Sequence, residues 1–227
     1  MTRAVLFDTE TTGLDPLTGD RVIEFAGIEL LNDLPTDRFL HVMVHPERDI
    51  PMEASRVHGM TLADLDGKPK FAEVAQQILD FLGDDPLIAH NAPFDFGFMN
   101  AEFRRCGKPE LDRARMVDTL VMAKERFPGM PNSLDALCRR FDIDLSARTT
   151  HNALLDCKLL AEVYVELTGG RQRGLGLADD DAQSAMQVAV YTASGARTPR
   201  LMAASDAQIA AHTAFVSRLK DPVWQKP

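Results

Sequence analysis

Two carboxylates, Asp8 and Glu10, stand two residues apart at the end of a short apolar run. In an extended strand residues i and i+2 point to the same face, so these side chains project together. Carboxylates held side by side repel each other unless a cation or a proton lies between them. The pair therefore predicts either a cation site or a solvated strand end. Thr11, Thr12 and Gly13 follow in a turn whose amides and hydroxyls can meet a ligand.

Two further acids lie at the beginnings of expected helices. Asp95 ends the motif HNAPFD, where a helix begins and negative charge is favoured. Helix capping alone would also explain it. Asp156 ends the motif HNALLD and shares a helical face with Leu160 and Val163. A carboxylate on such a core-facing stripe is costly unless it is paired, hydrogen-bonded or metal-bound, so Asp156 is the clearest single indication of a site.

A histidine, His151, begins the second of these motifs just before the helix that carries Asp156. It lies within reach of whatever Asp156 binds. The ordinary pKa of histidine, about 6.5, suits a general base at neutral pH. A structural role is the alternative for a histidine of this kind.

Alternating strand and helix patterns surround these residues. Strands are expected at residues 4–7, 21–31, 39–45, 87–89 and 116–117. Asn32, Asp33 and Pro35 are turn residues, so the second and third strands are expected to pair as a hairpin. Helices are expected at residues 71–82, 94–106 and 119–127, after Ser133, and from Asn152 to about residue 168. This order predicts a mixed α/β sheet with helices on its faces.

The composition is that of an ordinary globular protein. The chain has 227 residues, 45% of them hydrophobic and 26% charged. No apolar run approaches 18 residues, and the start of the chain has no signal-peptide pattern, so we expect neither a membrane span nor secretion. The three cysteines, Cys106, Cys138 and Cys157, are widely spaced and are read as reduced thiols of a cytoplasmic protein.

The net charge of −9 argues against binding nucleic acid by bulk electrostatics. Residues 1–168 hold 18 Lys and Arg against 29 Asp and Glu, a net −11, whereas residues 169–227 hold 7 against 5, a net +2. An acidic domain can still act on nucleic acid if metal ions lie between its carboxylates and the phosphates. It would bind weakly alone and need a partner to hold the substrate.

After Gly170 the sequence becomes rich in Gly and Asp and loses helical and strand periodicity. This change predicts three parts: a domain at 1–170, a flexible linker at 171–184, and a tail at 185–227. In the tail, Ser205 can cap a helix. The apolar residues of the tail are the candidate docking residues Ile209, Val216, Leu219 and Trp224, the only tryptophan of the chain.

The motifs DTETTG, HNAPFD and HNALLD, in this order, resemble the three exonuclease motifs of the DEDD superfamily, in its histidine-containing branch. The matching positions are Asp8, Glu10, Asp95, His151 and Asp156. The resemblance implies that the four acids hold two divalent metal ions, Mg²⁺ or Mn²⁺, and that His151 is the general base. It implies that Asp8 bridges both metals, that Glu10 and Asp156 complete the site of the nucleophilic water, and that Asp95 acts on the second metal. The implied fold is ribonuclease H-like, a mixed five-stranded sheet flanked by helices, here with a flexible C-terminal tail.

The resemblance extends to the proofreading subunits of bacterial replicative DNA polymerases, over about residues 4–170 and more weakly in the tail. The stretches that carry it are residues 57–60, 127–129, 132–138, 160–164 and 168–170. This implies a 3′–5′ exonuclease that removes mispaired 3′-terminal nucleotides as 5′-mononucleotides. The alternative is a stand-alone DEDD exoribonuclease similar to oligoribonuclease or ribonuclease T, which would not need the tail. A non-catalytic adaptor is disfavoured by the complete set of motif residues.

The same resemblance implies the substrate and the partners. The residues expected around a single-stranded or frayed 3′ end of DNA are Asp8, Glu10, Thr11, Thr12, His58, Asn91, Phe94, His151 and Asp156. For Phe94, core packing is an equal alternative. The tail is expected to dock on the polymerase (alpha) subunit of DNA polymerase III, at the replisome in the bacterial cytoplasm. Gln172, Leu175 and Leu177 resemble a motif that binds the sliding clamp, with an inert linker as the alternative.

Overall fold

The structure is a computed structural model in which residues 2–146, 148, 150–169 and 203–220 are described. The chain forms two compact units, Met1–Leu177 and Ala178–Pro227. The first contains the sheet and all but one of the described helices, and the second contains helix α7 (Asp206–Val216). The linker predicted at 171–184, with Gln172, Leu175 and Leu177, and the predicted docking residue Trp224 lie outside the described residues.

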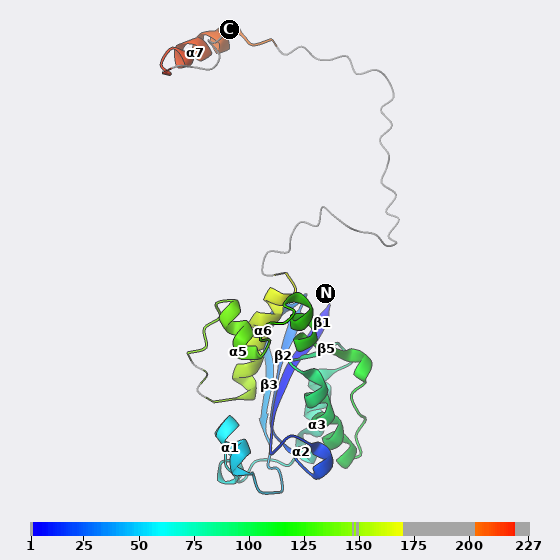
Figure 1. Ribbon diagram of the computed structural model, residues 1–227. Helices are drawn as coiled ribbons and strands as arrows, with labels where there is room; N and C mark the ends of the chain where they lie inside the picture. Colours follow the sequence, from blue (N-terminus) through cyan, green and yellow to red (C-terminus); the bar gives the residue numbers. More distant parts are fainter. Residues whose placement is uncertain (1, 147, 149, 170–202, 221–227) are drawn as a thin grey trace, which may run out of the picture. The chain divides into compact units, whose positions relative to one another are not determined.

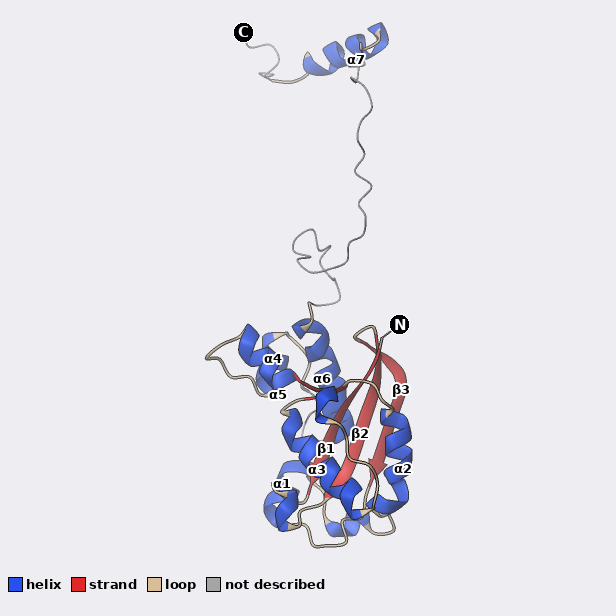
Figure 2. Ribbon diagram, turned by 90° about the vertical axis from the view of Figure 1, so that its right-hand side faces the viewer, coloured by secondary structure: helices blue, strands red, loops and turns tan. Residues whose placement is uncertain are grey.

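A five-stranded mixed sheet forms the centre of the first unit, as predicted (Figures 1 and 2). Its strand order is β3-β2-β1-β4-β5. Strand β1 pairs with β2 antiparallel and with β4 parallel, and β4 pairs with β5 parallel. The strands are β1 (Arg3–Thr11), β2 (Val22–Leu31), β3 (Leu34–Met43), β4 (Leu87–Ala89) and β5 (Met116–Asp118).

Helices cover both faces of this sheet. One core packs sheet residues against α2 and α3, and the other packs them against α4, α5 and α6. In Figure 1 α5 and α6 lie to the left of the strands and α3 to the right. The helices of this unit are α1 (Met52–His58), α2 (Phe71–Leu82), α3 (Ala92–Arg105), α4 (Thr119–Arg126), α5 (Leu134–Arg140) and α6 (Ala153–Leu167).

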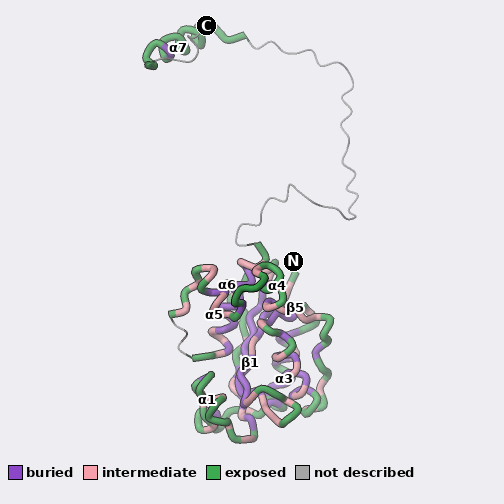
Figure 3. Tube along the Cα trace, viewed as in Figure 1, coloured by how far each residue is buried: buried purple, intermediate pink, exposed green. Residues whose placement is uncertain are grey.

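The pleat of β1 decides where its acids point. Val5 and Phe7 belong to the core that includes α2 and α3, whereas Leu6 belongs to the core that includes α6. Successive side chains of a strand alternate between faces, so Asp8 and Glu10 share the face of Leu6. Figure 3 shows how much of β1 is buried. The strand therefore delivers its carboxylates toward α6 from inside the protein.

The predicted hairpin is confirmed, but β3 begins earlier than predicted, at Leu34, so the turn is shorter. Asn32 and Asp33 both have positive φ angles, 52° and 65°, as a two-residue hairpin turn requires. Pro35 lies inside β3 rather than in the turn, at the edge of the sheet where its missing N–H is tolerated. Strand β1 continues past its apolar residues to Thr11, because its polar end still pairs with β2.

The predicted caps are also confirmed. The side chains of Ser133, Asn152 and Ser205 each accept a hydrogen bond from a backbone N–H of the first turn of α5, α6 and α7. Helix α1 was not predicted from the sequence, since it has only seven residues and buries His58 alone. No helix among the described residues is long and apolar enough to cross a membrane. Cys106, Cys138 and Cys157 are free thiols, as expected.

In the unit Ala178–Pro227, the three described docking candidates differ in burial. Ile209 and Leu219 are exposed, whereas Val216 is buried within its own unit. The two exposed side chains are thus available for contact with another surface.

Candidate active site

A cavity of about 720 Å³ opens where β1 and β4 end. These parallel strands are neighbours in the sheet, and open α/β sheets bind ligands beyond the carboxyl ends of such strands. All five predicted catalytic and metal-binding residues line this cavity: Asp8, Glu10, Asp95, His151 and Asp156. Three stretches of the chain that are far apart in sequence thus meet at one place.

The two carboxylates of β1 lie in a strongly acidic surrounding. Burial, followed by the charges of Asp95 and Glu10, raises the pKa of Asp8 well above its usual value. Burial, followed by the charge of Glu24, raises the pKa of Glu10 to about 8. Without a cation, these groups therefore hold protons at pH values where exposed carboxyl groups are ionised.

Asp95 comes from the first turns of α3 and is held by β1. The backbone N–H and the hydroxyl of Thr9 both donate to its Oδ1, at 3.1 and 2.7 Å. Burial raises the pKa of Asp95 to about 7, although these hydrogen bonds oppose the rise. Successive side chains of β1 point to opposite faces of the sheet. Thr9 therefore holds Asp95 on one face, while Asp8 and Glu10 point toward α6 on the other.

His151 and Asp156 come from the start of α6. The Nδ1 of His151 lies 3.4 Å from Oδ2 of Asp156, and the imidazole is exposed. The backbone N–H of His151 donates to the carbonyl of Val57 at 3.1 Å, which ties this segment to α1. Ligand atoms of Glu10, His151 and Asp156 all lie within 4.8 Å of one another, close enough to hold one ion.

An arginine that the sequence analysis missed, Arg148, contacts this cluster. Its Nε and Nη2 donate to the two oxygens of Asp156 at 2.6 and 2.7 Å, and its Nη1 donates to Asp135 at 2.6 Å. Its Nη2 also lies 3.0 Å from Nδ1 of His151. Burial alone would raise the pKa of Asp156, but the hydrogen bonds from Arg148 and His151 lower it. An arginine in a polar segment gives no sequence signal for such a contact.

The donor set fits hard divalent cations. The acids offer carboxylate oxygens, which suit Mg²⁺ or Mn²⁺ better than zinc. Within the described part of the chain, Asp156 is the one acid of the four that forms an ion pair with an arginine. Asp8, Glu10 and Asp95 are left with raised pKa values that a bound cation would relieve.

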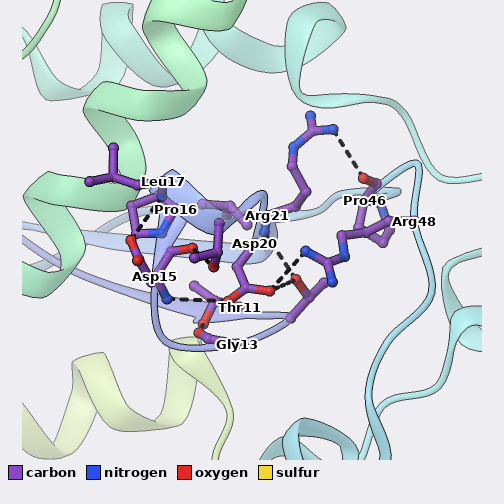
Figure 4. Close-up of polar contacts among 12 residues, drawn as sticks. Thr11, Gly13, Asp15, Pro16, Leu17, Asp20, Arg21, Pro46 and Arg48 are labelled. Carbon is purple, nitrogen blue, oxygen red and sulfur yellow. Dashed lines mark hydrogen bonds and ion pairs between the residues drawn. The ribbon is translucent and has the colours of Figure 1, made fainter.

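The loop after β1 forms one wall of the cavity and is held by its own polar contacts (Figure 4). The carboxylate of Asp20 accepts from Arg48 at 2.9 Å and from the backbone N–H of Asp15 at 3.2 Å. A Cβ atom on Gly13 would lie 2.2 Å from Oδ2 of Asp20, so a larger residue there would displace this carboxylate. The hydroxyl of Thr11 donates to the carbonyl of Gly13 at 2.6 Å. The turn is therefore shaped before any ligand arrives.

Four of the five residues predicted only as substrate contacts line the cavity: Thr11, Thr12, His58 and Phe94. Phe94 also packs on the core, with its ring centroid 4.9 Å from that of Phe98, so the core-packing alternative is confirmed and the substrate contact stays a prediction. Asn91 does not line the cavity. It adopts a left-handed backbone, φ 64°, and its N–H donates to Asp118.

The sequence analysis missed several apolar residues of the cavity wall, Leu14, Pro51, Ala54 and Val57. Leu14 is 85% exposed. An apolar residue directly after a polar turn was the available signal for Leu14.

Comparison with known proteins agrees with this geometry. Residues 5–164 match the exonuclease family model, RNase_T. The chain is 47% identical to the DNA polymerase III subunit epsilon of Rickettsia felis over 185 residues, covering 80% of this chain and 81% of the relative. It is 40% identical to the DNA polymerase III subunit epsilon of Escherichia coli (strain K12) over 227 residues, covering 94% and 92%. The chain belongs to the exonuclease family. It is a 3′–5′ exonuclease of the kind to which the epsilon subunits belong.

Solved structures show the same exonuclease fold. Exonuclease X, solved in complex with 5′ overhanging duplex DNA, matches 74% of this chain and 91% of its own at 26% identity, with a TM-score of 0.57. A 3′-exonuclease that recognises a histone mRNA stem-loop matches 75% of this chain at 18% identity, with a TM-score of 0.63, and shares the fold. Divalent metal ions are the cofactors that this exonuclease family implies, and the acidic cluster fits them.

Proposed function

We propose that this exonuclease proofreads DNA as a subunit of the bacterial replicative polymerase, removing mispaired 3′-terminal nucleotides as 5′-mononucleotides. The observation that carries the proposal is the convergence of four acids and His151 in one cavity at the ends of β1 and β4. The epsilon subunits support the choice of DNA, since relatives of that name align with most of this chain.

In this proposal Asp8, Glu10, Asp95 and Asp156 hold two divalent ions, Mg²⁺ or Mn²⁺. Bound there, two such ions would supply activation of water and charge stabilisation for the phosphate and for the leaving oxygen. The four acids must be ionised to do this, because a carboxylate binds a cation only after it has lost its proton. Arg148 must also release Asp156, since its guanidinium covers both oxygens of that carboxylate.

His151 takes the proton of the attacking water. Its imidazole is exposed at the cavity and adjoins Asp156, so it can accept a proton there and release it to solvent. It is the one histidine of the cavity that lies beside an acid of the cluster, whereas His90 shares a hydrogen bond with Thr119. Thr11, Thr12, His58 and Phe94 surround the terminal nucleotide without reading its base, since an aromatic ring stacks on any base.

Selectivity for mismatches needs no base readout in this account. A mispaired 3′ end frays more easily, and unpairing costs a few kcal/mol, least at a mismatch. Single-stranded ends therefore reach the cavity more often from mispaired primers.

His151→Gln is expected to lower turnover about a hundredfold or more while the affinity for single-stranded DNA changes little, because a general base contributes about 10²–10⁴-fold. Single-turnover kinetics with a binding titration measures both. His45→Gln, a histidine outside the cavity, is the matched control. A fall in affinity with normal turnover would make His151 a substrate ligand instead.

The second candidate function is a stand-alone exoribonuclease. One protein with the same fold is a 3′-exonuclease that recognises a histone mRNA stem-loop. Initial rates on a 3′-mispaired DNA primer and on a short RNA of the same sequence distinguish the two. The proposal expects the DNA primer to be degraded faster. A clear preference for RNA would favour the alternative.

The tail is proposed to hold the exonuclease on the polymerase (alpha) subunit through Ile209, Val216, Leu219 and Trp224. Exposed Ile209 on α7 and exposed Leu219, which follows this helix, support this. A short flexible linker gives an effective concentration of roughly millimolar, which would compensate for weak DNA binding by an acidic domain. The linker motif Gln172, Leu175 and Leu177 remains a proposed contact with the sliding clamp, and the replisome in the bacterial cytoplasm remains the proposed location.

A fragment of residues 1–170 is expected to degrade single-stranded DNA as fast as the full chain but to lose stable association with the polymerase subunit. In the full chain, Trp224→Ala is expected to weaken that association by about 2 kcal/mol or more, the usual threshold for a binding hot spot. Trp224→Phe, which keeps an aromatic ring, is the control. A fragment that binds the polymerase as tightly as the full chain would show that the tail is not the tether.

A further inference from the structure

A fifth carboxylate, Glu24 of β2, lies beside the four acids and is not one of the motif residues. Its side chain is fully buried, and it stands opposite Glu10 in the pairing of β1 with β2. Within the described residues, its ion-pair partner is His41 of β3, whose Nε2 lies 2.6 Å from its Oε1. Burying a carboxylate costs free energy unless it is paired or hydrogen-bonded, so the contacts of Glu24 indicate what its burial achieves.

Both oxygens of Glu24 are taken by donors at the beginning of α6. The Nδ2 of Asn152 donates to Oε1 at 2.8 Å, and the backbone N–H of Ala153 lies 3.3 Å from Oε2. The first N–H groups of a helix have no partner within the helix, and negative charge is favoured at this end. Glu24 therefore holds the N-terminus of α6 from the neighbouring strand.

This contact reaches the catalytic residues through one turn of helix. Asn152 follows His151 directly, and its carbonyl accepts the N–H of Asp156 at 2.8 Å. Asp8 and Glu10 come from β1, which is hydrogen-bonded to the strand of Glu24. The carboxylate of Glu24 thus links the sheet, which carries Asp8 and Glu10, to the beginning of α6, where His151 and Asp156 lie.

We propose that Glu24 is a positioning residue for the exonuclease reaction: it fixes His151 and Asp156 at the distance from Asp8 and Glu10 that metal binding and proton transfer require. The inference rests on the proposed roles of His151 and Asp156. Glu24 acts through them rather than on the metal, because its oxygens already accept from Asn152 and Ala153. A misplacement of about 1 Å at a reacting group can lower the rate about a hundredfold.

The test is Glu24→Gln, which keeps the shape of the side chain but sets an amide NH₂ against one of the donors of α6. We expect turnover on single-stranded DNA to fall about 10- to 100-fold with little change in KM, and Mn²⁺ to bind about 10-fold or more weakly by calorimetry in the absence of DNA. Glu29→Gln is the matched control. Glu29 lies on the same strand and is also buried, but it pairs with Arg3 and Arg38, away from the cavity.

A second variant guards against a failure of Glu24→Gln to fold. Asn152→Ser keeps an oxygen that can cap α6 but removes the Nδ2 donor to Glu24, and it should lower turnover and Mn²⁺ affinity in the same direction, by a smaller factor. If both folded variants match the Glu29→Gln control in turnover and in Mn²⁺ affinity, Glu24 serves packing only and the proposal is wrong.

Asp156→Asn, assayed alongside, separates this inference from the site assignment on which it rests. If Asp156→Asn is inactive while the Glu24 and Asn152 variants behave as wild type, only the role of Glu24 fails. If Asp156→Asn retains wild-type turnover, the assignment of the site fails first.

Discussion

Asp8→Ala is expected to lower exonuclease turnover at least about a thousandfold, because one of the carboxylates proposed to hold the metal ions is lost. The same change should leave the melting temperature of the metal-free protein unchanged or slightly higher. Asp8 is half-buried beside other acids that raise its pKa, so its removal relieves repulsion rather than breaking an attractive contact. A nuclease assay and a thermal melt of the same preparation measure both effects.

Asp37→Ala is the control for this variant, since Asp37 is an exposed acid on β3. It should match the wild type in both measurements. Near-normal turnover of Asp8→Ala would remove the proposed site, whereas a large loss of stability would show that Asp8 is structural.

The affinity for Mn²⁺ is expected to rise by more than about two orders of magnitude between about pH 6 and about pH 8, because Glu10, Asp95 and Asp8, whose pKa values are all raised, must lose their protons before the metal binds. The pKa of Asp95 is about 7 and that of Glu10 is about 8. A carboxyl group whose pKa is higher in the folded than in the unfolded protein stabilises the metal-free fold only while the group is protonated. That contribution is fully present below the ordinary carboxyl pKa and is lost as the pH rises through about 7 and 8.

Two effects follow for thermal stability. The melting temperature of the metal-free protein should fall across this pH range, and the increase on adding Mn²⁺ should be larger at the higher pH. In an Asp8→Ala, Asp156→Ala double variant the increase should largely disappear. An undiminished increase in that variant would place the metal elsewhere, and a metal affinity independent of pH would contradict the protonated state of the free site.

Local patterns in the sequence indicate the acids of the site, but only the three motifs taken together predicted them, because Asp8, Glu10 and Asp95 each also fitted a structural role. The spacing of Asp8 and Glu10 already puts them on one face of a strand, and the position of Asp156 on an apolar stripe already indicates a partnered carboxylate. The mixed sheet follows from the order of short apolar runs and helical segments. These features depend on neighbours within a few residues, which is the range over which strand and helix periodicity acts.

Such patterns cannot predict contacts between segments that are far apart in the sequence. Glu24 reaches Asn152 across 128 positions of sequence, and neither residue type predicts the other. The hydrogen bonds from Arg148 to Asp156 span only eight positions of the sequence, but Arg148 lies where the sequence has no helical or strand periodicity. Asn91, predicted as a substrate contact by resemblance, does not line the cavity, and its backbone is left-handed where α3 begins.

The most direct test of the central claim is a digestion of two DNA primers that differ only in whether the 3′-terminal base is paired or mispaired, with and without Mg²⁺. The account predicts that 5′-mononucleotides are released from the 3′ end only with the metal, faster from the mispaired primer, and not at all by Asp8→Ala. Release that persists without a divalent metal, or equal activity of Asp8→Ala, would contradict it.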